Sequence, residues 1–172
     1  DLHQLTLLWF GDDAKHFKKW HHFSNGFIDF RRTFIGTSSK TKKTGDFNST
    51  LGKQIVDDLM KVERPLAIDV ANYFLDMKKV FAETHRILKK GGKACVIIGN
   101  TSLRGVEILN AQVAAEQMQV AGFTNVDFIK REIPNKMITP WRDTESGKFT
   151  GMNNPSKTRA YEFEYVIVME KK

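Results

Sequence analysis

Apolar residues recur every three or four positions in two long stretches of the chain, and this spacing predicts two amphipathic helices. The apolar face of the first consists of Leu51, Ile55, Val56, Leu59 and Val62. Arg64-Pro65 is expected to end this helix, because proline disrupts a helix interior. The second helix is expected to start at Asp69 as its N-cap and to run to the turn Lys89-Lys90-Gly91-Gly92. Residues 2–10 and Val106–Ala121 show shorter helical patterns.

Other stretches have the character of strands. Ala94–Gly99 is an unbroken apolar, β-branched run, which predicts a central strand covered on both faces. Asn125–Ile133 is a second predicted strand, and the alternating segment Ala160–Glu170 a third, next to a sheet edge. Between them, Asn135–Arg159 is predicted to be a long polar loop. The order helix, strand, helix, strand, loop, strand predicts a layered α/β domain.

Composition limits the class of protein further. The chain has 172 residues, of which 41% are hydrophobic, enough for one core. A single cysteine, Cys95, excludes a disulfide framework and a CxxC zinc site and favours a reducing, cytoplasmic compartment. No apolar stretch approaches the roughly 20 residues that cross a membrane, so no membrane association is expected. His16, His21 and His22 lack cysteine or carboxylate partners at ligand spacing, and no metal is expected.

The chain carries a formal net charge of +7, and its basic residues are unevenly distributed. Lys40, Lys42 and Lys43 lie in the hydroxyl-rich segment Thr37–Gly45, which has no apolar periodicity. Lysine supplies charge and Ser and Thr supply hydrogen bonds, so such a loop suits contacts with phosphates. A solvated basic connector explains the same pattern equally well, so both interpretations stay open.

The segment Phe81–Ala94, Phe-Ala-Glu-Thr-His-Arg-Ile-Leu-Lys-Lys-Gly-Gly-Lys-Ala, resembles the helix and turn before the fifth strand of class I S-adenosylmethionine-dependent methyltransferases. That family usually has proline where this chain has Lys90. The two glycines allow a tight reversal between helix and strand. The resemblance implies the C-terminal part of a Rossmann-like sheet, strands five to seven, with an antiparallel last strand.

Further segments resemble bacterial DNA amino-methyltransferases of restriction-modification systems, in the region that follows their catalytic Ser/Asp-Pro-Pro-Tyr motif. The matching segments are Leu2–Gly11, Arg31–Thr37, Ile133–Lys136, Trp141–Asp143, Gly147–Phe149 and Glu164–Val168. The resemblance implies a methyl transfer from S-adenosylmethionine to the exocyclic amine of adenine or cytosine in duplex DNA.

Two motifs of that family are missing from this chain. There is no glycine-rich cofactor loop, and none of the four prolines is adjacent to another, so there is no Pro-Pro-Tyr. The resemblance therefore implies that residues upstream of Asp1 bind most of the cofactor and hold the catalytic group, and that this chain alone is inactive. We expect a single domain over residues 1–172, with 12–65 as a variable, DNA-facing insertion and 66–172 as the core. Its expected partners are duplex DNA and the missing N-terminal half, a second chain or another copy of itself.

The resemblance also implies site residues. The expected DNA contacts are Arg31, Arg32, Lys40, Lys42, Lys43, Lys136 and Arg142. Trp141 and Asn100 are expected at the base pocket, with a packing role as the alternative for Trp141. Two other functions stay open: a methyltransferase acting on RNA, protein or a small molecule, and a non-catalytic DNA-binding or interaction module derived from the same fold.

Overall fold

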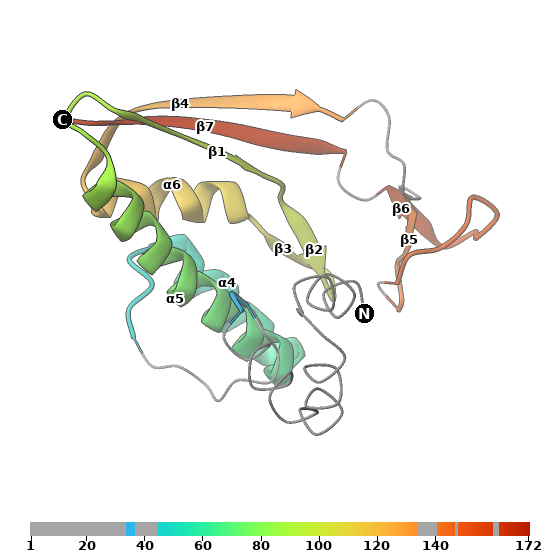
Figure 1. The fold of residues 1–172 in the computed structure, drawn as a ribbon. Helices are drawn as coiled ribbons and strands as arrows, with labels where there is room; N and C mark the ends of the chain where they lie inside the picture. Colours follow the sequence, from blue (N-terminus) through green and yellow to red (C-terminus); the bar gives the residue numbers. More distant parts are fainter. Residues whose placement is uncertain (1–33, 37–44, 134–140, 147, 160–161) are drawn as a thin grey trace, which may run out of the picture.

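A computed structural model describes most of the chain (Figure 1). The described residues are 34–36, 45–133, 141–146, 148–159 and 162–172. The first half of the described part consists of two helices, α4 (Thr50–Val62) and α5 (Arg64–Ile87), followed by two strands, β1 (Lys93–Ile98) and β2 (Thr101–Leu103). The remainder consists of β3 (Val106–Ile108), α6 (Asn110–Val120), β4 (Phe123–Glu132), β5 (Trp141–Asp143), β6 (Lys157–Arg159) and β7 (Phe163–Lys171). The helix predicted at residues 2–10 lies outside this described part.

The largest sheet has three strands in the order β1-β7-β4. Strand β7 is antiparallel to both neighbours, so β1 and β4 run parallel to each other on either side of it. The α/β class and the antiparallel last strand are confirmed. Strand β7 is the central strand and therefore lies next to the edge strands β1 and β4, in agreement with the predicted place beside a sheet edge, and its Ile167 and Met169 are completely buried.

The described helices lie on one side of this sheet (Figure 1). Helix α6 packs against the sheet, where Met118 and Ala111 are buried with Phe81 of α5 and Phe123 of β4. A second cluster lies between α4 and α5 and includes Leu59, which is fully buried. The result is two layers, with a core between the sheet and the helices and another among the helices.

Strand β1 does not have the predicted central position. It lies at the edge of the described sheet, and only alternate residues face the helices: Ala94 is buried, whereas Ile97 is 58% exposed. Ile97 lies beside Val166, and Val166 beside Ile129 of β4, which is 54% exposed. The apolar run Ala94–Gly99 predicts a strand that is covered on both faces of the sheet, but the described helices cover only one face (Figure 1). On the other face, Ile97, Val166 and Ile129 form an apolar row.

The start of α5 differs from the prediction. Helix α4 ends at Val62 as predicted, but α5 already begins at Arg64, and Asp69 lies inside it instead of capping it. Proline is tolerated in the first helical turn, where its missing N–H would have no intrahelical acceptor. Pro65 therefore starts the second helix as well as following the first.

The predicted helix Val106–Ala121 is shorter than expected, because its first residues form a hairpin with β2. Arg104 and Gly105 connect the two strands with φ values of +51° and +79°. Positive φ at both central residues is typical of the two-residue turns that suit the twist of a hairpin. Helix α6 then begins at Asn110. The predicted polar loop Asn135–Arg159 likewise contains the hairpin β5–β6.

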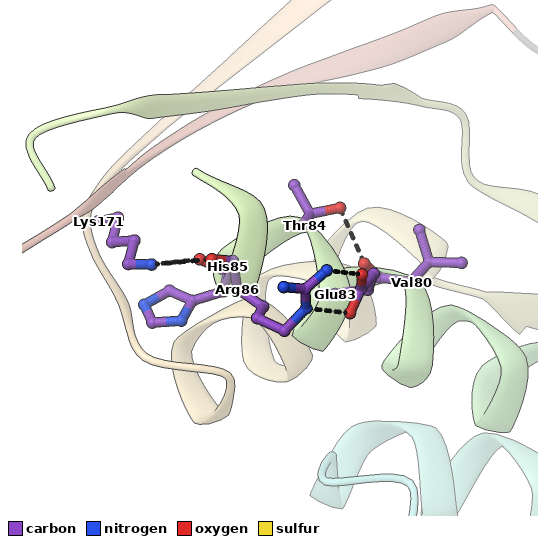
Figure 2. A network of polar contacts seen from close by, with 6 residues as sticks. All are labelled: Val80, Glu83, Thr84, His85, Arg86 and Lys171. Carbon is purple, nitrogen blue, oxygen red and sulfur yellow. Dashed lines mark hydrogen bonds and ion pairs between the residues drawn. The ribbon is translucent and has the colours of Figure 1, made fainter. Parts of the chain in front are cut away.

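The Gly91-Gly92 turn is tightly constrained. Gly91 has a φ of +75°, and a Cβ on Gly92 would lie 2.7 Å from the carbonyl oxygen of Lys89. Gly91 N donates to Lys171 O over 2.7 Å, and Lys171 N donates to Gly92 O over 2.9 Å. The ammonium of Lys171 also donates to His85 O at the end of α5, over 2.6 Å (Figure 2). The two glycines thus allow α5 to reverse into β1 while the turn is held against the end of β7.

Candidate functional site

A cleft of about 690 Å³ opens beyond the carboxyl end of β1. It lies between the β2–β3 hairpin, the start of α6, the β5–β6 hairpin and the start of β7. Its polar lining includes Asn100, Thr101, Ser102, Arg104, Glu107, Gln112, Arg142, Asp143, Thr144, Thr158, Arg159 and Glu162. Ligands of open α/β sheets gather beyond the carboxyl ends of strands, so this cleft is the candidate site.

Asn100 lines the cleft and also caps α6. Its Oδ1 accepts from Ala111 N over 2.9 Å, and its Nδ2 donates to Gln112 Oε1 over 2.9 Å. The residue at the N-cap position of α6, Leu109, has no side chain that can accept this hydrogen bond. Asn100 therefore supplies the missing cap from outside the helix, which gives it a structural function whatever ligand the cleft takes.

Arg104 joins three parts of the molecule at the rim of the cleft. Its Nε lies 2.5 Å from Glu63 Oε2, at the α4–α5 junction. Its Nη1 donates to the carbonyl oxygens of Glu145 and Ser146, over 3.5 and 3.4 Å. These contacts connect the β2–β3 turn to the helices and to the β5–β6 hairpin. The sequence pattern did not single out Arg104, because none of its partners is near in sequence.

The β5–β6 hairpin forms the far wall of the cleft. A third segment pairs with β5 on its other side: Asp143 N donates to Lys148 O over 2.9 Å, and Thr150 N donates to Trp141 O over 3.0 Å. The guanidinium of Arg142 lies 4.4 Å from the centre of the Phe149 ring, within the range of a cation–π contact. A small three-segment sheet thus carries two of the predicted site residues, Trp141 and Arg142.

Asp143 is the hydrogen-bonding centre of this small sheet. Its Oδ1 accepts from Ser146 N, Ser146 Oγ and Glu145 N, and its Oδ2 accepts from Asn154 Nδ2, all within 2.7 to 3.1 Å. The hydrogen bonds from Ser146 and Asn154 stabilise the charged carboxylate and lower the pKa of Asp143 to about 2. This carboxylate organises the turn and is already saturated with donors.

The structure describes three of the predicted site residues, Asn100, Trp141 and Arg142. Asn100 and Arg142 line the same cleft although they are far apart in sequence. Trp141 is half-buried in β5, with the ammonium of Lys157 5.4 Å from its ring centre, and it is not among the residues that line the cleft. The other predicted DNA contacts lie outside the described residues: Arg31, Arg32, Lys40, Lys42, Lys43 and Lys136.

The described fold and cleft define a two-layer α/β domain with a polar site at one end of its sheet. No protein-family model, curated protein or solved structure matches the chain. Within the described residues, no helix has the length and apolar character needed to cross a membrane. The same part of the chain contains no group of three His, Cys, Asp or Glu side chains arranged to hold a metal ion.

Proposed function

We propose that this chain is the C-terminal part of an S-adenosylmethionine-dependent DNA methyltransferase that acts on the exocyclic amine of adenine or cytosine. The observation that carries the proposal is the arrangement of α5, β1 and β7. The glycine turn that resembles the methyltransferase pattern leads from α5 into β1, and the last strand lies antiparallel between the parallel strands β1 and β4. This is the antiparallel last strand that the resemblance implies.

The incomplete cover of the sheet supports the idea of a missing half. Within the described residues, β1 has no neighbour on its outer edge, and Ile97 and Ile129 are more than half exposed on the uncovered face. An open edge beside an apolar row is a surface that proteins normally cover. In the proposed enzyme, upstream strands and helices pair with β1 and cover this row.

The same surface predicts how the 172-residue chain behaves by itself. Without the upstream half, the apolar row and the open edge of β1 are expected to drive self-association. Sedimentation velocity over a hundredfold range of concentration measures this directly. A monodisperse monomer that melts cooperatively at every concentration would contradict the missing-half proposal.

The chemistry of the proposed reaction assigns this chain a positioning role. An exocyclic amine is inaccessible inside the stacked duplex, so the base has to be flipped out. The cofactor supplies a sulfonium methyl group, and the transfer depends mainly on holding the amine nitrogen in line with it. The chain carries neither the glycine-rich cofactor loop nor the Pro-Pro-Tyr motif, and in the described cleft the carboxylate of Asp143 already accepts hydrogen bonds from Ser146 and Asn154. We therefore assign cofactor binding and catalysis to upstream residues, and the wall of the base pocket to this chain.

Methyl transfer by the protein that the full gene encodes tests the proposal. Tritiated S-adenosylmethionine is incubated with duplex DNA, and incorporation into adenine and cytosine is measured. Label on RNA, protein or a small molecule but not on DNA would move the substrate to that class. A gene that encodes no glycine-rich loop or Pro-Pro-Tyr motif upstream, in a protein with no transfer activity, would favour a non-catalytic module or an enzyme completed by a second polypeptide.

Charge-removing variants test the predicted DNA contacts separately. The triple variant K40Q/K42Q/K43Q is compared with K79Q/K89Q/K90Q, which removes the same charge from exposed lysines in and after α5. Each phosphate contact contributes about 0.9 to the slope of log affinity against log salt concentration. The first variant is expected to lower this slope by about 2 to 3, the control by less than about 1. Equal slopes in the two variants would show that the lysine-rich segment does not contact phosphates.

A further inference from the structure

The structure points to a second DNA-contacting element, which we propose is the tip of the β5–β6 hairpin. We infer that Lys148, in the segment beside β5, and Arg159, at the cleft end of β6, contact phosphates and that the loop around Met152 enters a groove of the duplex, with the Met152 side chain against the bases. This inference rests on the proposed DNA substrate. It adds a contact surface on residues outside the predicted site set.

The first argument is charge. Residues 141–162 contain four basic side chains, Arg142, Lys148, Lys157 and Arg159, against three acidic ones, Asp143, Glu145 and Glu162. The guanidinium of Arg159 donates to Glu162 Oε1 over 3.0 Å. The carboxylate of Asp143 is directed into the turn, where it accepts hydrogen bonds from Ser146 and Asn154. Lys148 and Arg159 are exposed. The hairpin thus presents a net positive surface, which is complementary to a phosphate backbone.

The second argument is the hydrogen bonding of the loop, which fixes its shape. Asn154 Nδ2 donates to Asp143 Oδ2 over 2.7 Å and to Thr150 Oγ1 over 3.1 Å, and Asn154 Oδ1 accepts from Ser156 N over 2.8 Å. The Lys157 ammonium donates to the carbonyl oxygen of Met152. A loop held in one conformation loses less entropy when it binds, so its contacts contribute more to affinity.

The third argument is the apolar surface that this ordered loop exposes. Met152 in the loop is 68% exposed, and Phe149, in the segment that pairs with β5, is 49% exposed with its ring against the guanidinium of Arg142. A single exposed apolar side chain needs no explanation. An exposed Met on a fixed loop, with an exposed Phe on the adjoining sheet segment and basic residues nearby, matches the combination that groove-binding proteins use, in which Met or Phe packs between base steps while basic residues hold the backbone.

Photo-crosslinking locates the tip on DNA. Benzoylphenylalanine replaces Met152 in the protein that the full gene encodes, and the control carries it at Val120, which is 61% exposed in the last turn of α6. Helix α6 ends away from the hairpin (Figure 1). Both chains are irradiated with mixed-sequence 30-base-pair duplexes at 50 mM salt. We expect at least tenfold more crosslinked DNA from position 152, with nucleobases among the crosslinked sites, and equal yields would overturn the inference.

Salt titrations test the phosphate contacts of the hairpin. K148Q/R159Q is compared with K79Q/K90Q, and the hairpin variant is expected to lower the salt slope by about 2, one per lost contact, and to weaken binding at least tenfold at 100 mM salt. Unchanged affinity in K148Q/R159Q, with wild-type DNA binding intact, overturns the hairpin contact and leaves the proposed function standing. If the wild-type chain and the full-length protein bind no duplex even at 50 mM salt, both the hairpin contact and the proposed function are wrong.

Discussion

Replacing Asn100 with alanine separates its capping role from a role in the candidate site. The substitution removes the acceptor for Ala111 N and the donor to Gln112 Oε1, each at 2.9 Å. Loss of a side-chain cap costs about 1 kcal/mol, with a range of roughly 0.5 to 2. Gln112 is half-buried, so water can replace part of the second bond. We therefore expect Asn100→Ala to lower the free energy of unfolding by about 1 to 2 kcal/mol.

Asn100→Asp is the matched control. The carboxylate keeps an acceptor for Ala111 N and adds a negative charge at the start of α6, where the helix dipole favours it by about 0.3 to 1 kcal/mol. Rotation of the Gln112 amide lets its Nε2 donate to the new carboxylate. The stability of this variant is expected to stay within about 0.5 kcal/mol of the unsubstituted chain.

Differential scanning calorimetry of the three chains at pH 7 measures both effects. One kcal/mol corresponds to about 2 to 4 °C in a domain of this size, so Asn100→Ala is expected to melt about 2 to 8 °C lower and Asn100→Asp almost unchanged. An Asn100→Ala chain that melts within 1 °C of the original would refute the capping argument. If Asn100→Asp keeps its stability but loses duplex affinity, Asn100 faces the nucleic acid as well.

Three further predictions follow from contacts in the fold: two concern substitutions and one concerns pH. Gly92→Ala places a Cβ 2.7 Å from the carbonyl oxygen of Lys89 and is expected to lower the free energy of unfolding in urea by about 1 to 3 kcal/mol. Gly151→Ala, with no atom within 4 Å of its Cβ, is the control that is expected to leave this free energy unchanged. Gln117→Leu removes the buried amide that donates to two backbone carbonyls over 2.8 and 2.9 Å, together with its buried Oε1, which has no hydrogen-bond partner in the described part of the chain. A net loss of about 1 to 3 kcal/mol is expected, and an unchanged urea midpoint would show that the two hydrogen bonds contribute no more than the unsatisfied oxygen costs. Because the pKa of Asp143 is lowered to about 2, its hydrogen bonds stabilise the hairpin above pH 4 and are lost as the pH falls toward 2. The amide resonance of Ser146 should shift over that interval and stay flat in Asp143→Asn, and a midpoint near pH 4 would contradict the network.

The local elements could be predicted from the sequence because their signals are local. The apolar spacing of α4, the body of α5 and the length of β4 are each visible within one stretch of the chain. The β2–β3 hairpin was missed because three-residue strands are too short to show alternation. Its one signal was the dipeptide Arg104-Gly105 between two short apolar segments, since glycine readily adopts positive φ.

The position of β1 and the β5–β6 hairpin depend on contacts between distant segments. An apolar run shows that a strand is suited to burial, but it does not show how many neighbours it has, and β1 has covered residues on one face only. Within the hairpin, Asp143 pairs with Lys157 across a long connection. The local signals there were Asp143 three residues before Ser146 and the Asn154-Pro155 pair, both typical of turns stabilised by side chains.

Strands β5 and β6 contribute residues to the cleft and are also joined by the loop that carries Met152. Arg142 and Asp143 of β5 and Arg159 of β6 line the cleft, and the segment that leaves β5 carries Met152. Arg104 fixes this hairpin to the β2–β3 turn and to Glu63. In the proposed enzyme, a duplex held at the tip lies on the side of the domain where the cleft opens beyond the carboxyl end of β1, and the flipped base is expected to enter there. Arg104→Ala loosens the hairpin without removing any proposed contact with DNA. It is expected to weaken both the binding of the duplex at the hairpin tip and the binding of the flipped base in the cleft.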